Sequence, residues 1–461
     1  MKAAAMHIAS ALLVVSGPSA FAQSRIIVSP NVQVSTARKD TAHIEVVLAA
    51  DPGNPQRLLA CSMMTGGVGA YVSFDGGRSW SAPVVSLGAP RANDPTCAYG
   101  PGGVAYFTHK LKQTQGPSDL DRLAVHRSLD GGRTWEPMNL GPQTTDRPWI
   151  AFDDRPEAGK WGRLFVSYNY HVHSESAPLN HKQPDFLNAV SLQSSSDGGR
   201  TFTTFAMRAL FGDSLHPFRQ PGMGGTVVLS DGTPLLLYSH DQGGGPNPAT
   251  GKTMVAASSL MVGRSIDGGE TLEPIHKVAD IQTSYNKPNT RTVTATIAAD
   301  RSASRFHDRV YVAWGDVRSG RTEIMLSSSS DRGVTWSAPV KVSDAPPGAS
   351  GEAGPDQFMP TVAVNKNGIV GVLWYDRRDS DDNLSYYARF SASTDGGATW
   401  LPSVLVSEAP NKAEGKSGTG VTSGDTAGLA ASADGIFHAL WVDNRTGVQQ
   451  VWTSAITVAA R

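Results

Sequence analysis

The chain has few cysteines, no excess of one charge and no long apolar run beyond its N-terminal region. It contains 2 cysteines in 461 residues, and 40 Lys and Arg stand against 41 Asp and Glu. Balanced charge argues against a nucleic-acid partner, because nucleic-acid-binding proteins carry a basic field. No later segment approaches the roughly 18 consecutive apolar residues that a membrane-spanning helix needs. The composition therefore predicts neither nucleic-acid binding nor a membrane span.

The two cysteines, Cys61 and Cys97, leave two interpretations open. An even pair in an exported protein is compatible with a disulfide. Free cysteine is also among the most buried residue types, so both could be small apolar residues in neighbouring strands. Neither interpretation implies redox chemistry.

No metal or cofactor site is expected. His171 and His173 have no third partner at the spacing of a zinc site. The acidic stretch 379–383 lacks the spacing and the glycine of a calcium loop. No nucleotide-binding glycine motif occurs, and the glycine pairs of the boxes belong to the repeat described below.

The first 22 residues resemble an export signal. Lys2 supplies the positive end, an apolar run follows from Ile8 to Val15, and Ala20-Phe21-Ala22 fits a cleavage site. The mature protein should then begin at Gln23 and be secreted or periplasmic. No linker or charge run divides residues 23–461, so we expect a single domain, and we expect a monomer.

One octapeptide with the pattern Ser-x-Asp-x-Gly-x-Thr-Trp occurs six times. The copies begin at Ser73, Ser128, Ser195, Ser265, Ser329 and Ser393. Its Asp can accept bonds from backbone amides, its Gly permits positive φ, and its last side chain anchors the turn in an apolar layer. We interpret it as a hairpin turn with a structural role. The pattern resembles the Asp box, or BNR repeat, of sialidases and of other propellers.

The spacing of the boxes predicts the number of blades. Successive box aspartates lie 55, 67, 70, 64 and 64 residues apart, from Asp75 to Asp395. A period of about 64 residues divides the mature length into seven, which predicts an all-β fold, a seven-bladed β-propeller, with six blades as the alternative. The last period ends without a box or an outer strand. Residues 25–35 resemble an outer strand, so we expect this N-terminal strand to close the last blade.

Functional side chains are expected on the face opposite the box turns, where loops surround the central channel. Polar residues before inner strands are Arg91, Asp94, Asp146, Arg147, Arg219, Arg291, Asp356 and Asp425. Second strands are followed by Tyr168 to His171, Tyr238 to Asp241, and three Trp-x-Asp-x-Arg turns that begin at Trp314, Trp374 and Trp441. Because the last motif recurs, it fits an Arg–carboxylate bridge between blades. Residues that occur once are better functional candidates.

The boxes and the Trp-x-Asp-x-Arg turns make the chain similar to the sialidase-like families. Sialidases grip the carboxylate of the sugar with three arginines, and use a Tyr nucleophile and an Asp acid/base. The resemblance implies a catalytic set of Asp146, Arg147, Arg291, Asp316 and Arg318, with Tyr170 and Tyr238 among several eligible nucleophiles. It implies substrate contacts from Arg219, His171, His240, Asp376 and Arg378. The Arg-Ile-Pro motif of sialidases is absent, and sialidases have six blades.

Three functions remain open. A glycosidase for terminal acidic sugars predicts three arginines around one carboxylate, beside a Tyr–carboxylate pair. A uronate polysaccharide lyase predicts a His/Tyr pair beside an Arg, for which His171, His240, Tyr170 and Arg147 are candidates. A non-catalytic propeller that binds glycan or protein predicts a mouth whose charged groups are paired with one another.

Overall fold

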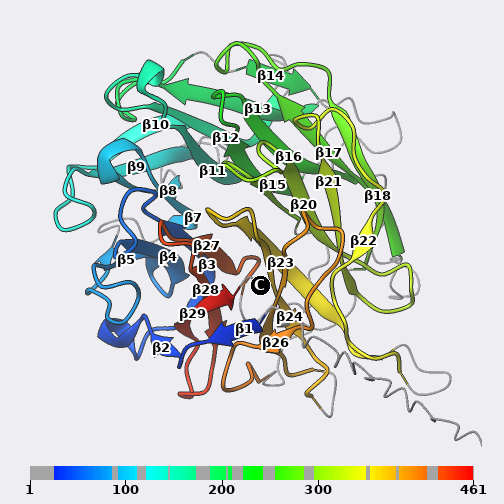
Figure 1. The fold of residues 1–461 in the computed structure, drawn as a ribbon. Helices are drawn as coiled ribbons and strands as arrows, with labels where there is room; N and C mark the ends of the chain where they lie inside the picture. Colours follow the sequence, from blue (N-terminus) through cyan, green and yellow to red (C-terminus); the bar gives the residue numbers. More distant parts are fainter. Residues whose placement is uncertain are drawn as a thin grey trace, which may run out of the picture.

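The chain folds into seven antiparallel sheets that follow one another round the molecule in sequence order (Figure 1). The computed structural model describes residues 25–85, 92–111, 121–143, 146–172, 187–203, 206–209, 222–241, 255–284, 295–348, 354–380, 384–412 and 424–459. Its helical segments are the short 3-10 turns η1 (Thr36–Arg38), η2 (Pro101–Gly103) and η3 (Pro156–Ala158). The all-β, seven-bladed propeller predicted from the repeats is confirmed. The predicted leader, 1–22, lies outside the described residues.

Blades 1 to 3 each contain four strands, and the first of them is the inner strand. Blade 1 is β3 (His43–Ala50), β4 (Leu58–Met64), β5 (Gly67–Ser73) and β6 (Val84–Val85). Blade 2 is β7 (Ala92–Tyr99), β8 (Ala105–Leu111), β9 (Arg122–Ser128) and β10 (Asn139–Gln143). Blade 3 is β11 (Asp146–Asp153), β12 (Arg163–Val172), β13 (Leu187–Ser195) and β14 (Ala206–Ala209).

Blades 4 to 6 repeat the same order. Blade 4 is β15 (Gly222–Val228), β16 (Pro234–Asp241), β17 (Val255–Arg264) and β18 (His276–Ser284). Blade 5 is β19 (Thr296–Ala299), β20 (Val310–Asp316), β21 (Glu323–Ser329) and β22 (Val340–Lys341). Blade 6 is β23 (Gln357–Val364), β24 (Val370–Asp376), β25 (Tyr387–Ser393) and β26 (Val404–Leu405).

Blade 7 is completed by the N-terminal strand, as the sequence predicted. Its first three strands are β27 (Gly428–Ala431), β28 (Phe437–Asp443) and β29 (Gln450–Ala459). The fourth is β1 (Arg25–Val28), which pairs antiparallel with β29. A second short strand, β2 (Val32–Gln33), also pairs with β29. Strands from the two ends of the described chain thus share one sheet, which closes the ring and leaves β29 without a free edge.

Apolar layers between successive blades form the core. Each of seven buried clusters draws side chains from two neighbouring blades, including one cluster between blades 7 and 1. Largest among the buried side chains are Trp314, Trp374 and Trp441, from the second strands of blades 5 to 7. Each blade therefore buries apolar side chains on both faces, as expected of propeller sheets.

The Asp box closes the turn between the third and fourth strands. In blade 5 the Ser329 hydroxyl donates to Asp331 Oδ1 (2.7 Å), and Asp331 also accepts bonds from the Thr335 amide (2.8 Å) and hydroxyl (2.5 Å). Trp336 Nε1 donates to the Gly333 carbonyl (3.2 Å), which fixes the indole under the turn. Every acceptor of Asp331 is occupied inside the turn, so the structural role predicted for the box follows from its contacts.

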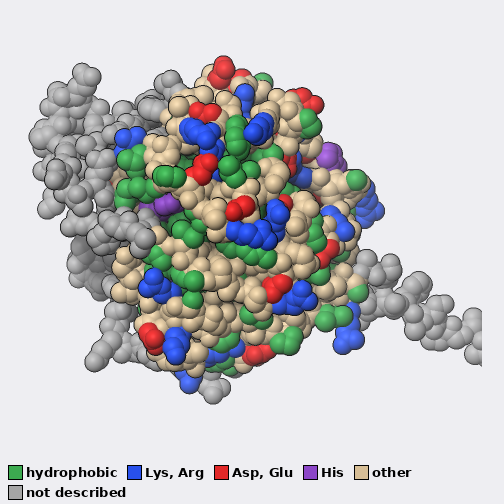
Figure 2. Space-filling model, turned by 90° about the vertical axis from the view of Figure 1, so that its left-hand side faces the viewer, with side chains coloured by type: hydrophobic (Ala, Val, Ile, Leu, Met, Phe, Trp, Pro, Cys, Tyr) green, Lys and Arg blue, Asp and Glu red, His purple; other side chains and the backbone are tan. Residues whose placement is uncertain are grey.

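The face of the molecule in Figure 2 carries acidic and basic side chains interspersed, with apolar residues scattered between them. In the part of the chain that the structure describes, no helix is long and apolar enough to cross a membrane.

Two buried imidazoles lie side by side in blade 2. His109 Nε2 and His126 Nε2 are 3.2 Å apart, the rings stack, and Phe107 packs against both. Burial lowers the pKa of each imidazole from 6.5 to about 4. Both rings are therefore neutral at pH 7, and protonation at this site would place charge in an apolar layer.

The imidazole pair predicts loss of stability in mild acid. Between about pH 6.5 and 4 the unfolded chain binds protons that the folded chain does not, so the free energy of unfolding should fall as pH falls. The loss is on the order of 3 kcal/mol per imidazole. Urea unfolding at several pH values measures it. His126→Gln should make the profile less steep, whereas His307→Gln, at a side chain 48% exposed, should leave it unchanged. A flat wild-type profile would contradict the prediction.

The closing strand offers a matched pair of variants. Ile26 packs against the apolar layer between blades 6 and 7, whereas the neighbouring Ile27 is 50% exposed. Ile26→Ala should lower the free energy of unfolding by about 1–2 kcal/mol, and Ile27→Ala by no more than about 0.5 kcal/mol. Denaturant unfolding compares them. Equal effects of the two variants would show that β1 does not contribute as described.

Candidate functional site

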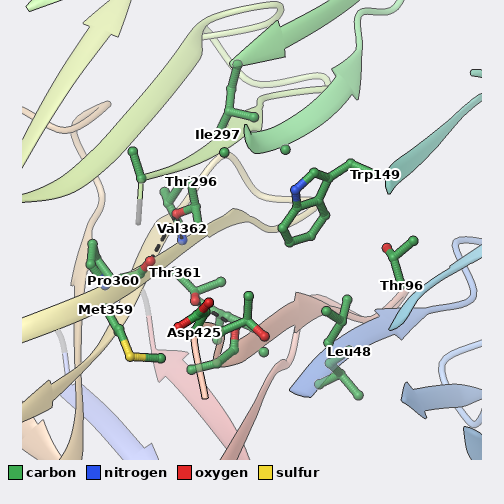
Figure 3. A pocket seen from close by; sticks show the side chains of 18 of the residues that line it. Leu48, Thr96, Trp149, Thr296, Ile297, Met359, Pro360, Thr361, Val362 and Asp425 are labelled. Atoms are coloured by element: carbon green, nitrogen blue, oxygen red, sulfur yellow. Dashed lines mark hydrogen bonds between the residues drawn. The ribbon is translucent and has the colours of Figure 1, made fainter. Parts of the chain in front are cut away.

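The inner strands of all seven blades line one cavity of about 190 Å³ on the propeller axis. Figure 3 shows side chains from several blades surrounding this common space. One lining residue from each blade, in blade order, is Val47, Thr96, Trp149, Thr226, Thr296, Thr361 and Ala427. Two threonines also bond adjacent blades: the Thr296 hydroxyl donates to the Pro360 carbonyl (3.2 Å) and the Thr361 hydroxyl to the Ala427 carbonyl (2.8 Å). Residues that line the channel cavity thus also hold neighbouring blades together.

The mouth of this channel lies opposite the boxes. The first and third strands of an antiparallel blade run in the same direction, and each box follows a third strand. The N-terminal ends of the inner strands must therefore lie at the other face. This is the face on which the sequence placed functional residues.

The inner strands of five blades carry a β-bulge near this mouth. The residues within the bulges are Glu45 in β3, Asp94 and Pro95 in β7, Arg147 and Pro148 in β11, Gly224 in β15, and Met359 and Pro360 in β23. Glu45, Asp94 and Met359 have φ of 53°, 52° and 52°. Positive φ costs a non-glycine residue about 1–3 kcal/mol, and bulges redirect side chains next to functional sites. We call these residues the bulge layer.

Carboxylates from three blades stand in or beside the bulge layer. Glu45 and Asp94 line a shallow recess that shares Val47, Thr96, Trp149 and Thr426 with the channel cavity. Gly424 packs so closely on the Glu45 side chain that a Cβ there would collide with it, and the next residue, Asp425, lines the cavity. The described mouth is therefore acidic over blades 7, 1 and 2.

Asp94 forms a mostly buried ion pair. Its Oδ2 lies 3.0 Å from Lys110 Nζ on β8, and the two side chains are 11% and 8% exposed. The lysine compensates the negative charge of Asp94 where little water reaches it, which holds a carboxylate at the mouth at lower cost.

Trp149 is the aromatic side chain of the cavity wall. Its indole lies beside the cavity, and its Nε1 is buried without a hydrogen-bond partner among the described residues. A buried N–H donor without an acceptor costs free energy unless a ligand supplies the acceptor. The flat face of the indole can also stack on a sugar ring. Trp149 can therefore offer a ligand both a stacking surface and one hydrogen bond.

A His/Tyr pair lies behind the mouth but is closed to solvent. His43 Nε2 and the Tyr71 hydroxyl are 2.7 Å apart, both side chains are fully buried, and His43 Nδ1 contacts the Thr41 carbonyl at 2.7 Å. Burial lowers the pKa of His43. This pair supports the start of β3 and cannot meet a polymer in an open groove.

The Trp-x-Asp-x-Arg turns hold their charges in internal pairs. Arg318 makes two bonds to the buried Asp316, of 2.8 and 2.7 Å, and Trp314 Nε1 donates to the same carboxylate (3.3 Å). Arg318 also donates to the Asp280 carbonyl of blade 4. The turn thus bridges two blades, as its recurrence suggested.

Blade 6 repeats the arrangement. Arg378 donates to Asp376 (3.0 and 2.7 Å) and pairs with Asp344 at 2.8 Å, beyond the outer strand of blade 5. Four of the predicted site residues therefore form two ion pairs, Asp316 with Arg318 and Asp376 with Arg378. Each pair is occupied in joining neighbouring blades.

The structure describes less of the remaining predicted site residues. Tyr238 is buried in the apolar layer between blades 3 and 4. Asp146, Arg147, Tyr170, His171 and His240 have their backbones in β11, β12 and β16, and their side chains lie outside the described residues. Arg219 and Arg291 lie outside the described residues altogether.

Sequence reasoning did not select Glu45, Lys110 or Trp149 as site residues. In the sequence, Glu45 occupies an ordinary outward position of an alternating strand. Trp149 has the apolar character of a core residue. The signal that could have found Glu45 is alignment of the inner strands, which puts Glu45, Asp94 and Arg147 at one register.

Both cysteines are free thiols in the structure, and both are buried. Among the described residues no group of three or more His, Cys, Asp and Glu could hold a metal ion. Of the acidic stretch 379–383 only Asp379 and Ser380 are described, and Asp379 pairs with Arg389 (2.9 Å).

A family model described as BNR/Asp-box repeat matches residues 71–82, which include the first box. No curated protein matches the chain. Among solved structures, a sialidase of Streptococcus pneumoniae shares 10% identity at a TM-score of 0.43, over 93% of this chain and 70% of that one. An α-L-arabinofuranosidase of Fusarium graminearum shares 14% at 0.45, over 94% and 98%.

A protein of unknown function from Dyadobacter fermentans shares 14% identity at a TM-score of 0.47, over 91% of this chain and 99% of that one. The six repeats, the matched segment and the closed ring of sheets agree with one another. They identify the chain as a seven-bladed β-propeller of the BNR/Asp-box type.

Proposed function

We propose that the protein is a glycoside hydrolase that binds the terminal sugar of a glycan at the mouth of its channel. The observation that carries this proposal is the bulge layer. It sets carboxylates from two adjacent blades beside a cavity with an aromatic wall. Most glycoside hydrolases use a pair of carboxyl groups, and an aromatic ring offers a flat face on which a sugar can stack.

We assign the two carboxylates different roles. Asp94 is compensated by Lys110, which suits a group that stays negative and stabilises positive charge developing on the sugar. Glu45 has the close backbone of Gly424 as its neighbour, and we assign it the proton transfer to the leaving oxygen. Trp149 would hold the sugar ring and donate its Nε1–H to a sugar oxygen.

The finer proposal is a terminal acidic sugar, such as a sialic acid. Arg147 occupies the bulge of β11, at the register of Asp94 in the neighbouring blade. In the sequence Arg219 and Arg291 precede β15 and β19, the inner strands of the next two blades. We propose that these three arginines, from the sequence of blades 3 to 5, supply the positive charge of the site. The carboxylate of the sugar would then bind to these arginines.

The alternative is a propeller that binds a glycan or a protein without catalysis. It is favoured by the internal pairing of Asp316 with Arg318 and of Asp376 with Arg378. The lyase hypothesis stays a prediction, because the side chains of its candidates His171, His240, Tyr170 and Arg147 lie outside the described residues. Export directed by residues 1–22 is also part of the proposal and would bring the protein to glycans outside the cytoplasm.

Hydrolysis assays on fluorogenic sugars test the proposal. Purified protein should release the fluorophore from a sialoside faster than from a neutral α-L-arabinofuranoside. Glu45→Gln and Asp94→Asn should each lower kcat by about 100-fold or more, because each removes a group that acts in the transition state. Glu157→Gln is the control, an exposed carboxylate in η3 on the box face.

The arginine assignment has its own test within the same assay. Arg147→Ala should lower kcat/KM for the sialoside by about 100-fold and leave turnover of a neutral sugar within about threefold, since only the former has a carboxylate to grip. Preference for the arabinofuranoside would reject the acidic sugar but keep the hydrolase. Glycan binding without hydrolysis would establish the alternative, and unsaturated products from a uronate polymer would establish a lyase.

A further inference from the structure

The two cysteines meet in the apolar layer between blades 1 and 2. Cys61 lies on β4, the second strand of blade 1, and Cys97 lies on β7, the inner strand of blade 2. Both belong to one buried cluster, with exposures of 0% and 5%. Although they are 36 positions apart in the sequence, the packing of neighbouring blades brings them together.

The contacts of Cys97 place its sulfur beside Cys61. Cys97 Sγ lies 3.5 Å from the Val47 carbonyl and 3.4 Å from the Leu59 carbonyl. Val47 is the cross-strand partner of Cys61 in the β3–β4 ladder, and Leu59 stands two residues before Cys61 on the same strand. Burial raises the pKa of the Cys61 thiol, and a side-chain hydrogen bond with Cys97 raises it further. The two thiols are thus direct neighbours.

The two cysteines differ in exposure. Cys97 is one of the residues that line the channel cavity and is 5% exposed, whereas Cys61 is 0% exposed. We therefore assign to Cys97 the first reaction with a small reagent, and to Cys61 the reaction with the group that has become attached to Cys97.

We propose that Cys61 and Cys97 are a disulfide-forming pair that an aliphatic disulfide oxidises in the folded protein. The Cys97 thiolate attacks the reagent, forms a mixed disulfide and releases one thiolate. The Cys61 thiolate then attacks the Cys97 sulfur, which forms the Cys61–Cys97 bond and releases the second. The two protons of the cysteines pass to the released thiolates, so two thiols are oxidised and one disulfide is reduced.

The bond would join blade 1 to blade 2 covalently. It would also restrain β7 at Cys97, three residues after Asp94 of the bulge layer. The raised pKa of Cys61 makes the second step slow at neutral pH and faster in mild alkali. This inference does not depend on the proposed hydrolase activity.

Alkylation and mass measurement of the full chain test the proposal. Reduced protein is incubated in mild alkali with cystamine, a small aliphatic disulfide, then denatured and treated with iodoacetamide. The product should take up no label, should be lighter than the reduced chain by two hydrogen atoms, and should yield a peptide that joins Cys61 to Cys97. Protein kept in a phosphine reductant should take up two labels. The oxidised form should melt about 5 °C higher.

Single variants separate the two steps. Cys61→Ala should accumulate a cysteamine adduct on Cys97, because nothing resolves it, and Cys97→Ala should stay unmodified while folded. Two labels on the cystamine-treated wild type would overturn the proposal. A stable adduct on Cys97 beside a free Cys61, or disulfide-linked dimers, would also overturn it.

Discussion

Burial of apolar side chains on both faces of every blade is the constraint from which the rest of the structure follows. A sheet that is apolar on one face can rest on a single partner, but a sheet such as β23–β26 needs a neighbour on each side. A row of such sheets has two unsatisfied ends until it closes on itself. Closure requires the last blade to pack on the first, which Leu440 and Val46 do in the layer between blades 7 and 1. The pairing of β1 with β29 then fastens that blade by backbone hydrogen bonds.

Closure also decides where a ligand can bind. Because the sheets radiate from one axis, their inner strands converge on a single cavity, and their ends divide the molecule into two unlike faces. The boxes fill one face with turns whose polar groups are satisfied internally, as Asp331 illustrates. At the other face the inner strands begin, and the bulges turn Glu45 and Asp94 out of the regular ladder at the cost of positive φ. Chemistry is therefore expected at the face where the bulges turn these side chains out of the ladder.

Repeats made the architecture readable from the sequence. Six boxes at a regular spacing gave seven blades, and the missing box of the last period pointed to the N-terminal strand, which the structure confirms. The same reasoning could not locate the mouth residues. Glu45 lies within an unremarkable alternating strand, and only its register shift against β4 shows that it leaves the ladder. Tyr238 lies in the second half of a second strand, where the sequence suggested a site residue, yet side-chain packing between blades 3 and 4 buries it. Register and packing depend on partners far apart in sequence, which local pattern does not reveal.

Departure from the repeat is the most useful guide to function in such a fold. At the cavity wall several blades are alike, since Thr96, Thr296 and Thr361 recur at one register. One step nearer the mouth, the bulges of blades 2, 3 and 6 share a proline but differ in the residue before it, which is Asp94, Arg147 or Met359, and the bulges of blades 1 and 4 hold Glu45 and Gly224. The Trp-x-Asp-x-Arg turns recur in three blades and bridge their neighbours. A structural need common to all blades selects the same residue each time, because each interface poses the same problem. A sugar offers a different group to each blade around the mouth, so a site for it needs different side chains. The bulge layer, where the residues diverge while the backbone is the same, is the part of the fold that meets this requirement.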